Sequence, residues 1–248
     1  MLSDFELEVI ERDYFRYILT FLRANLTPII DGLNSRIKIL NDWYQKFIKT
    51  AGTSRKQPSD LDIGAERIFH HFFASILHLP NSSPIGSDLM FEAPDAFIHI
   101  EVKTALIDNP ADYKGKINVA TNQTSYEIKG SFIPNLPQYY KLKGNVEKPC
   151  LTYIIQIVHE YAKPNIKALI LTCLPNGQLY SVYGKNIFRS GKTKKTSFRY
   201  RYSAEPHFKL LTKRYKEKIF RVELVYIDKN LNIKDITALS DIPVHFQF

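Results

Sequence analysis

Residues 87–104 read Ser-Asp-Leu-Met-Phe-Glu-Ala-Pro-Asp-Ala-Phe-Ile-His-Ile-Glu-Val-Lys-Thr, and this stretch decides the fold. Two runs of alternating apolar residues, 88–92 and 97–103, flank the sequence Ala-Pro-Asp-Ala at 93–96. Alanine, proline and aspartate in four residues between such runs are typical of a tight turn. The stretch therefore predicts an antiparallel β-hairpin.

Pairing across this turn gathers charged side chains on one face of the hairpin. Asp88 then lies opposite Glu101, with the two carboxylates about 5 Å apart, and Lys103 lies on the same face. The other face is apolar and turns towards the core, and it carries Leu89, Phe91, Ile98, Ile100 and Val102. Because like charges side by side in a sheet repel each other, the arrangement indicates a site for a divalent cation with oxygen ligands.

The run Ile100-Glu101-Val102-Lys103 after an upstream aspartate resembles the signature of the PD-(D/E)xK nuclease superfamily. Type II restriction endonucleases form the largest group of that superfamily. The resemblance covers only the hairpin. It implies a restriction-endonuclease-like fold and Mg²⁺, for which Mn²⁺ substitutes, held by Asp88, Glu101 and the Val102 carbonyl. It also implies that Lys103 is catalytic together with Asp88 and Glu101.

A second aspartate competes for the role of metal ligand. Pro94-Asp95 spells the literal Pro-Asp of the signature, six positions before Glu101. Asp95 sits at the tip of the turn, where an extended strand places it about 20 Å from Glu101. Geometry therefore favours Asp88, although Asp88 follows Gly86-Ser87 rather than proline, and Asp95 is the alternative.

A helix is predicted over residues 59–79, just before the hairpin, with its apolar face turned inward. In the resembling family such a helix often supplies a further acidic ligand. Glu66 is the candidate because it is the only carboxylate in the body of the helix. The alternative is that Glu66 is a flanking surface residue.

The rest of the chain predicts an α/β protein. Two apolar faces at helical spacing, before and after Pro28, indicate an amino-terminal helical layer. A mixed central β-sheet of about five or six strands contains the catalytic hairpin and is flanked by helices. Further strands are expected at 151–158, 166–174 and 179–183, and residues 219–226 and 244–248 supply more strand-like sequence. One domain is expected over 1–248, with 1–58 as a helical extension and 59–248 as the catalytic core.

Positive charge is concentrated in residues 185–218. Twelve basic and two acidic residues give this segment a net charge of +10, so the rest of the +9 chain sums to −1. Interleaved aromatic residues suit the segment to a phosphate backbone, although a solvated lysine-rich loop is the alternative. The candidate DNA contacts in it are Lys185, Arg189, Lys192, Lys194, Lys195, Arg199 and Arg201.

Residues 105–137 are polar and rich in breakers, so an irregular connection is expected there. Asn122 and Gln123 lie at its centre. Side chains of these types pair bidentately with adenine in the major groove, which makes them candidate base readers. Helix capping explains the same two residues equally well.

These features together predict a Mg²⁺-dependent endonuclease that cleaves double-stranded DNA at a specific, palindromic sequence. Resemblance to restriction enzymes also implies a homodimer, because a palindromic site mirrors a two-fold axis. A structure-specific nuclease, such as a Holliday-junction resolvase or a repair nuclease, is the first alternative, and a non-catalytic DNA-binding protein is the second. No apolar run of transmembrane length and no secretory pattern occurs, so a cytoplasmic protein with no membrane partner and no small-molecule cofactor is expected.

Overall fold

The computed structural model describes residues 2–35, 60–77, 79–80, 87–120, 138–160, 165–176, 188–190, 197–201 and 221–237. Its helices are α1 (Asp4–Ala24), α2 (Leu26–Ser35), α4 (Asp60–Phe73), the 3₁₀ turn η1 (Pro110–Asp112) and α7 (Ile233–Ile236). Its strands are β1 (Leu79–Pro80), β2 (Leu89–Glu92), β3 (Phe97–Leu106), β4 (Ile117–Ala120), β5 (Tyr139–Lys141), β6 (Glu147–His159), β7 (Ile166–Leu174), β8 (Phe188–Ser190), β9 (Ser197–Tyr200) and β10 (Val222–Ile227).

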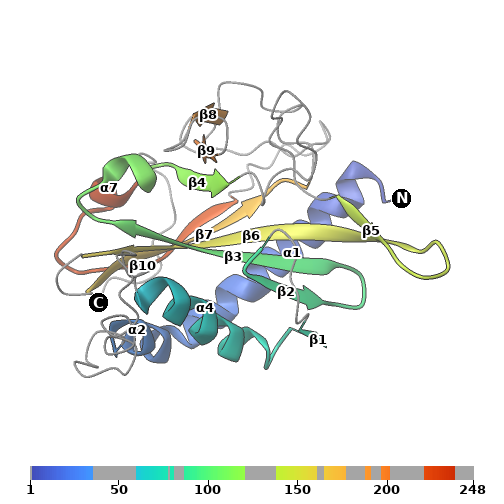
Figure 1. Ribbon diagram of the computed structural model, residues 1–248, viewed down its shortest axis with the longest axis horizontal. Helices are drawn as coiled ribbons and strands as arrows, with labels where there is room; N and C mark the ends of the chain where they lie inside the picture. The colour runs from blue at the N-terminus through green and yellow to red at the C-terminus, as the bar shows by residue number, and fades with distance from the viewer. Residues whose placement is uncertain are drawn as a thin grey trace, which may run out of the picture.

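Seven of the described strands form one mixed sheet in the order β1-β2-β3-β6-β7-β10, with β5 paired to β6 (Figure 1). The pair β3–β6 is parallel, and the other neighbours are antiparallel. The predicted α/β class with a mixed sheet is confirmed. The strand count exceeds the expected five or six because β1 and β5 are too short to show an alternating pattern. Residues 179–183 and 244–248 lie outside the described residues.

The predicted hairpin is confirmed, and so is its register. Strands β2 and β3 pair antiparallel, with Glu92 opposite Phe97 and Met90 opposite His99. The Ala93 N–H donates to the Ala96 carbonyl at 2.9 Å and closes the turn. Lys148 fastens the turn to β6, because its Nζ lies 2.7 Å from the Glu92 carboxylate.

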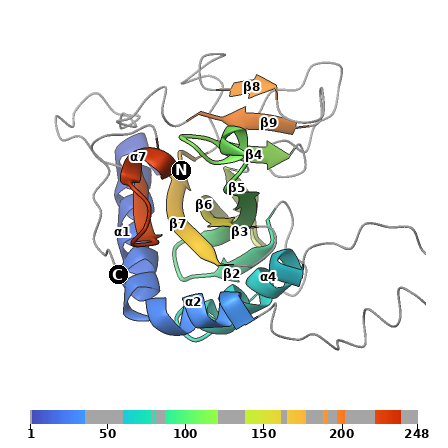
Figure 2. The ribbon, with the colours of Figure 1, turned by 90° about the vertical axis from the view of Figure 1, so that its left-hand side faces the viewer.

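Helices α1, α2 and α4 cover one face of the sheet (Figures 1 and 2). The apolar core on this side includes the inward set predicted for the hairpin, namely Leu89, Phe91, Ile98, Ile100 and Val102. Helix α4 ends at Phe73 rather than at Leu79. The helical pattern of hydrogen bonds ends there, because the Ser75 N–H donates to the Phe72 carbonyl at 3.3 Å and the Ile76 N–H to the Phe73 carbonyl at 3.1 Å, three residues back instead of four. Helices α1 and α2 share this core, so they pack on the sheet directly.

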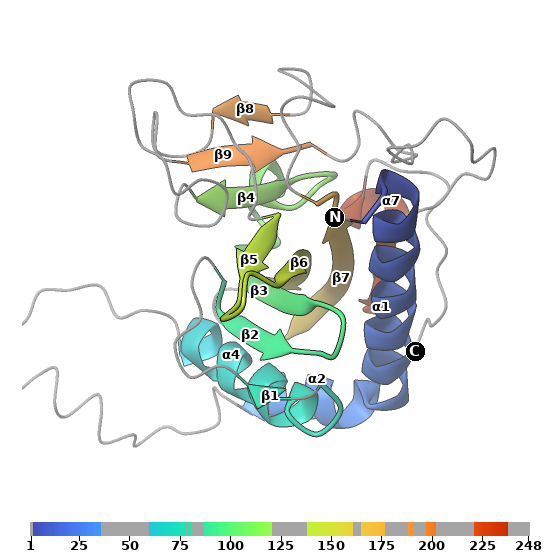
Figure 3. The same cartoon turned by 90° about the vertical axis from the view of Figure 1, so that its right-hand side faces the viewer.

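A small sheet, in the order β4-β9-β8, lies over the other face of the main sheet (Figures 2 and 3). Ile117 of β4 and Tyr200 of β9 are fully buried and share a core with Ile154 of β6. The expectation of an irregular connection over 105–137 is thus wrong for its first part, since β3 continues to Leu106 and β4 pairs with β9. Strands β4 and β9 have four residues each and lie far apart in the sequence, so no local pattern indicates them.

Buried charges tie α1 to the far edge of the sheet. Arg221, at the start of β10, lies 2.6 Å from the Glu11 carboxylate and 3.7 Å from that of Glu8. All three residues are buried. The other Glu11 oxygen accepts the Asn176 N–H at 2.6 Å, and the Tyr153 hydroxyl donates to the Glu11 carbonyl at 2.9 Å. One arginine therefore compensates two carboxylates on the buried side of α1.

Among the residues that the structure describes, no helix combines the length and the apolar character needed to cross a membrane.

Replacing Arg221 with Met should destabilise the protein by about 3–5 kcal/mol, because it removes the guanidinium that lies 2.6 Å from the buried Glu11 carboxylate. Urea unfolding measures this loss. Arg12→Ala is the matched control, since Arg12 pairs at 3.2 Å with the exposed Asp13, and such pairs contribute about 1 kcal/mol or less. Equal effects of the two substitutions would contradict the structural role given to Arg221.

Candidate active site

The hairpin brings Asp88, Glu101 and Lys103 together on one face. Asp88 precedes β2, and the other two residues belong to β3. The Asp88 N–H donates to Glu101 Oε2 at 3.2 Å, and the Val102 N–H donates to Asp88 Oδ2 at 2.8 Å. A backbone N–H therefore holds each carboxylate: that of Asp88 holds Glu101, and that of Val102 holds Asp88. The pairing predicted from the sequence places these residues as the structure does, while their roles stay predictions.

Lys103 forms an ion pair with Glu101. The Lys103 side chain is 23% exposed, whereas that of Glu101 is 3% exposed. Glu101 is thus buried, whereas the end of the lysine side chain is partly exposed.

The pKa of Glu101 is raised to about 8 as the net result of three effects: burial raises it, the positive charge of Lys103 lowers it, and the negative charge of Asp88 raises it. Burial is the largest of these effects because it removes the carboxylate from water. The buried carboxyl therefore holds a proton more tightly than a solvated one does. A second positive charge at this position would restore its ionised form.

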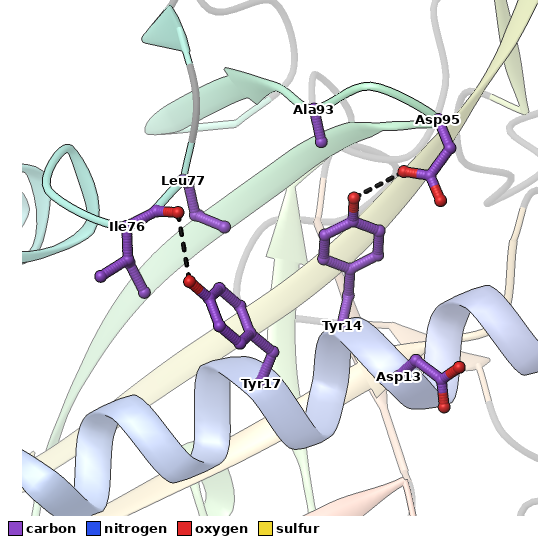
Figure 4. Close-up of a pocket in the computed structure, with 7 residues that line it drawn as sticks. All are labelled: Asp13, Tyr14, Tyr17, Ile76, Leu77, Ala93 and Asp95. Carbon is purple, nitrogen blue, oxygen red and sulfur yellow. Dashed lines mark hydrogen bonds between the residues drawn. The ribbon is translucent and has the colours of Figure 1, made fainter.

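Asp95 is turned towards α1 (Figure 4). Its Oδ1 accepts the Tyr14 hydroxyl proton at 2.5 Å, and burial together with Asp95 raises the pKa of Tyr14, which keeps that proton in place. Both residues line a cavity of about 330 Å³ with Asp13, Tyr17, Ile76, Leu77 and Ala93. Tyr17 also donates to the Ile76 carbonyl at 3.3 Å. The interactions of Asp95 are thus with the helical layer.

Glu66 lies in α4, which packs against β3. It stands one turn before His70, whose ring stacks on Phe91 of β2 with 6.1 Å between centroids. Within the described ranges, no three His, Cys, Asp or Glu side chains gather closely enough to hold a metal ion. The structure therefore does not bring Glu66 together with Asp88 and Glu101, and its role as a ligand stays a prediction.

Part of the basic segment belongs to the small sheet. Arg199 lies in β9, opposite Arg189 of β8, and Arg201 follows β9. Arg199 already has a partner in the protein, because its guanidinium lies 3.1 Å from the buried Asp112 carboxylate. A phosphate contact for these arginines stays a prediction. The other predicted contacts, Lys185, Lys192, Lys194, Lys195, Asn122 and Gln123, lie outside the described residues.

Two buried polar residues near the carboxylates were missed by sequence reasoning. His99 is 1% exposed, faces the same side as Glu101 and lies 3.2 Å from the Tyr140 hydroxyl through its Nε2. Burial lowers the pKa of His99 to about 4, so the ring is neutral. Gln156 of β6 is the parallel partner of Lys103. Strand alternation could have indicated His99, whereas Gln156 becomes visible only once β3 and β6 are paired.

The Glu101→Gln variant should be more stable than the wild type at pH 9 in EDTA, and this advantage should shrink towards pH 5. A pKa raised from 4.5 to about 8 means that the folded state retains the proton more strongly, so wild-type stability falls as the pH rises through about 8. A gain of about 2–6 °C in Tm is expected at pH 9, corresponding to about 1–2 kcal/mol. Glu147→Gln, at an exposed glutamate, should show no such pH dependence, and a flat difference for Glu101→Gln would refute the raised pKa.

Two family models match this sequence in succession. Residues 4–163 match the amino-terminal domain of the type II restriction enzyme MwoI, and residues 166–227 match its central domain. In the structure, strands from both matched segments lie in the same main sheet. No curated protein gives a significant sequence match.

Two solved structures are similar to most of this chain. The restriction endonuclease BglI, bound to its DNA recognition sequence, has a TM-score of 0.55 at 15% identity, and the match covers 87% of this chain and 90% of that one. The tetrameric restriction endonuclease SfiI, bound to cognate DNA, has a TM-score of 0.46 at 16% identity, with coverage of 82% and 81%. The likeness to BglI confirms the predicted restriction-endonuclease-like fold. Since the first family model alone spans more than half of the sequence, the chain belongs to the family of the type II restriction enzyme MwoI.

Proposed function

We propose that this protein is a Mg²⁺-dependent endonuclease of the PD-(D/E)xK superfamily that cleaves double-stranded DNA at a specific, palindromic sequence. The observation that carries the proposal is the meeting of Asp88 and Glu101 across the hairpin, with Lys103 beside them. Membership of a restriction-enzyme family supports DNA as the substrate. It also favours a sequence-specific enzyme over a structure-specific nuclease or a non-catalytic DNA-binding protein.

The residues present fit a hard divalent cation. Carboxylate and carbonyl oxygens are the ligands that Mg²⁺ prefers, and Asp88, Glu101 and the Val102 carbonyl are the residues that would hold it. Mn²⁺ is expected to substitute. When bound, such an ion lowers the pKa of a coordinated water and stabilises the charge that develops on the phosphate. The raised pKa of Glu101 supports the fit, because burial leaves this carboxyl in need of a positive partner.

Lys103 is the residue that would act on the nucleophile. Its ammonium group lies beside Glu101 and its side chain is partly exposed, so it can reach both the carboxylates and an entering phosphate. There it would orient the attacking water and balance the negative charge of the phosphate. The short distance along β3 keeps this ammonium close to the acidic pair.

The small sheet offers a surface for the DNA backbone. Its buried residues pack on the face of the main sheet that carries Ile154, and Ile154 is the parallel partner of Glu101. The strands of the basic segment therefore lie on the same side as the carboxylates. Phosphate contacts from this segment would hold DNA against an acidic site that repels it by itself.

A homodimer belongs to the proposal as well. Two copies related by a two-fold axis match the symmetry of a palindromic site, so that each copy cuts one strand.

Digestion of genomic DNA tests the function directly. The wild-type protein with Mg²⁺ should give discrete fragments, and EDTA should prevent cleavage. Sequencing the fragment ends would then give the recognition sequence and its symmetry. A smear of fragments with random ends would refute sequence specificity, and absence of any cleavage in Mg²⁺ or Mn²⁺ would refute the nuclease assignment.

Asp88→Asn should abolish cleavage, because it removes a carboxylate from the metal site, whereas Asp95→Asn should be nearly silent. Lys103→Ala and Glu101→Ala should also be inactive while remaining folded and able to bind DNA. Cleavage rates of a plasmid that carries the site measure these effects. The reverse result for the two aspartates would mean that the literal Pro-Asp spelling was the better guide.

Replacing Lys192, Lys194 and Lys195 together with Gln should weaken DNA binding on all sequences. Each phosphate contact removed should reduce the slope of log K against log salt concentration by about one unit. Titrations at several salt concentrations measure the slope, and Lys229→Gln, in the exposed turn after β10, is the control. A slope that the triple substitution leaves unchanged would place this segment away from the DNA.

A further inference from the structure

Gln156 lies beside the proposed catalytic lysine in the centre of the main sheet. It belongs to β6, and the parallel register pairs it with Lys103 of β3. Paired residues of neighbouring strands send their side chains to the same face, and the strands run about 4.8 Å apart. Gln156 is 1% exposed, so its amide group is enclosed by protein on the side of the sheet where Lys103 and Glu101 lie.

Two backbone carbonyls fix the orientation of this amide. Gln156 Nε2 donates to the Asp112 carbonyl at 2.9 Å and to the Lys116 carbonyl at 3.2 Å. Since a carbonyl can only accept, the nitrogen must occupy that side of the amide, and the oxygen is left on the other side. Both donated protons are used, so the group cannot turn without losing them.

The Oε1 atom of Gln156 is buried and accepts no hydrogen bond from any of the residues that the structure describes. A buried acceptor without a partner destabilises a fold, and native proteins contain few of them. One use of such an atom is to receive a donor that arrives in another state of the site. Gln156 is paired with Lys103 of β3 and Ile170 of β7, and of these two side chains only the lysine has protons to donate.

Lys103 has donors to spare. An ammonium group carries three N–H bonds, and in the structure this group pairs with Glu101. Glu101 is also a proposed cation ligand, and a carboxylate that binds a cation holds a neighbouring ammonium less strongly. A flexible four-carbon side chain released in this way needs another acceptor to keep a single position.

We propose that Gln156 is a positioning residue for Lys103, whose ammonium group donates to Gln156 Oε1 when Glu101 engages a divalent cation. The inference rests on the proposed nuclease function and deepens it. The anchored amide supplies a fixed acceptor, so that the lysine points steadily at the site of attack. Support of this kind from outside the reacting groups is worth about 10–100-fold in activity at comparable sites.

Two substitutions separate this role from simple support of the fold. Gln156→Met removes both the acceptor and the donor, while Gln156→Glu keeps an acceptor oxygen and loses the donation to Asp112 and Lys116. Both should lower Tm, and Gln156→Glu should lower it at least as much as Gln156→Met, because its carboxylate faces the two carbonyl oxygens. Gln156→Met should also lower the single-turnover cleavage rate about 10–100-fold with DNA affinity unchanged, whereas Gln156→Glu should stay within about 5-fold of the wild type.

Thr152→Val is the matched control. Thr152 Oγ1, also in β6, is likewise buried with no hydrogen-bond partner among the described residues. The register, however, pairs Thr152 with His99 rather than with Lys103. This variant should cut at the wild-type rate. Equal losses of rate in Gln156→Met and Gln156→Glu, in step with their losses of Tm, would show that only the donation to the carbonyls matters and would overturn the proposal.

A measurement without cleavage gives a second test. Tm values of Gln156→Met, Lys103→Met and the double variant form a cycle that can be measured in EDTA and in Ca²⁺. The two effects should add in EDTA, where Lys103 pairs with Glu101, and should depart from additivity by about 2 °C or more in Ca²⁺. Additive effects in both conditions would refute the contact.

The outcomes also separate this inference from the proposed function. An active wild type with a fully active Gln156→Met variant would overturn the inference alone. A wild type that cleaves no DNA with any divalent metal would overturn both.

Discussion

Repulsion between the Asp88 and Glu101 carboxylates is the constraint that the surrounding structure has to overcome. The register of the hairpin fixes the two positions, because the pairing of β2 with β3 places Asp88 beside Glu101. The Val102 amide and the Lys103 ammonium offset part of the repulsion. The apolar residues on the other face of the hairpin fix the register, because a slip by one residue would move the whole set out of the core.

The hairpin could be predicted because everything that specifies it is local. Alternation with a period of two, a turn of four residues and two charged positions are all contained in eighteen residues. Strand β7 was likewise predicted with its observed ends at Ile166 and Leu174, since it is a continuous apolar run. The choice of Asp88 over Asp95 followed from strand geometry, and the structure places both residues accordingly.

What could not be predicted depends on partners that are distant in the sequence. Glu8 and Glu11 look like solvated positions on α1, and they are buried because Arg221 reaches them from the other end of the chain. From the sequence, Arg199 is predicted to contact phosphate. Its ion pair with Asp112 becomes visible only once β4 and β9 are known to be neighbours. In each case a charged side chain finds its opposite only through the tertiary fold, so spacing along the sequence carries no signal.

The parallel pair β3–β6 has a consequence for the time at which the molecule becomes a nuclease. Strand β3, which carries Glu101 and Lys103, can pair with β6 only after the residues of β6 have been synthesised. The Glu11 carboxylate of α1 can pair with Arg221 only after Arg221 has emerged from the ribosome. Chains are made from the amino terminus and contacts of long sequence separation form last. In a nascent chain, the hairpin is thus synthesised early but becomes part of the packed sheet late. Incomplete chains therefore lack the packed sheet that holds the two carboxylates side by side.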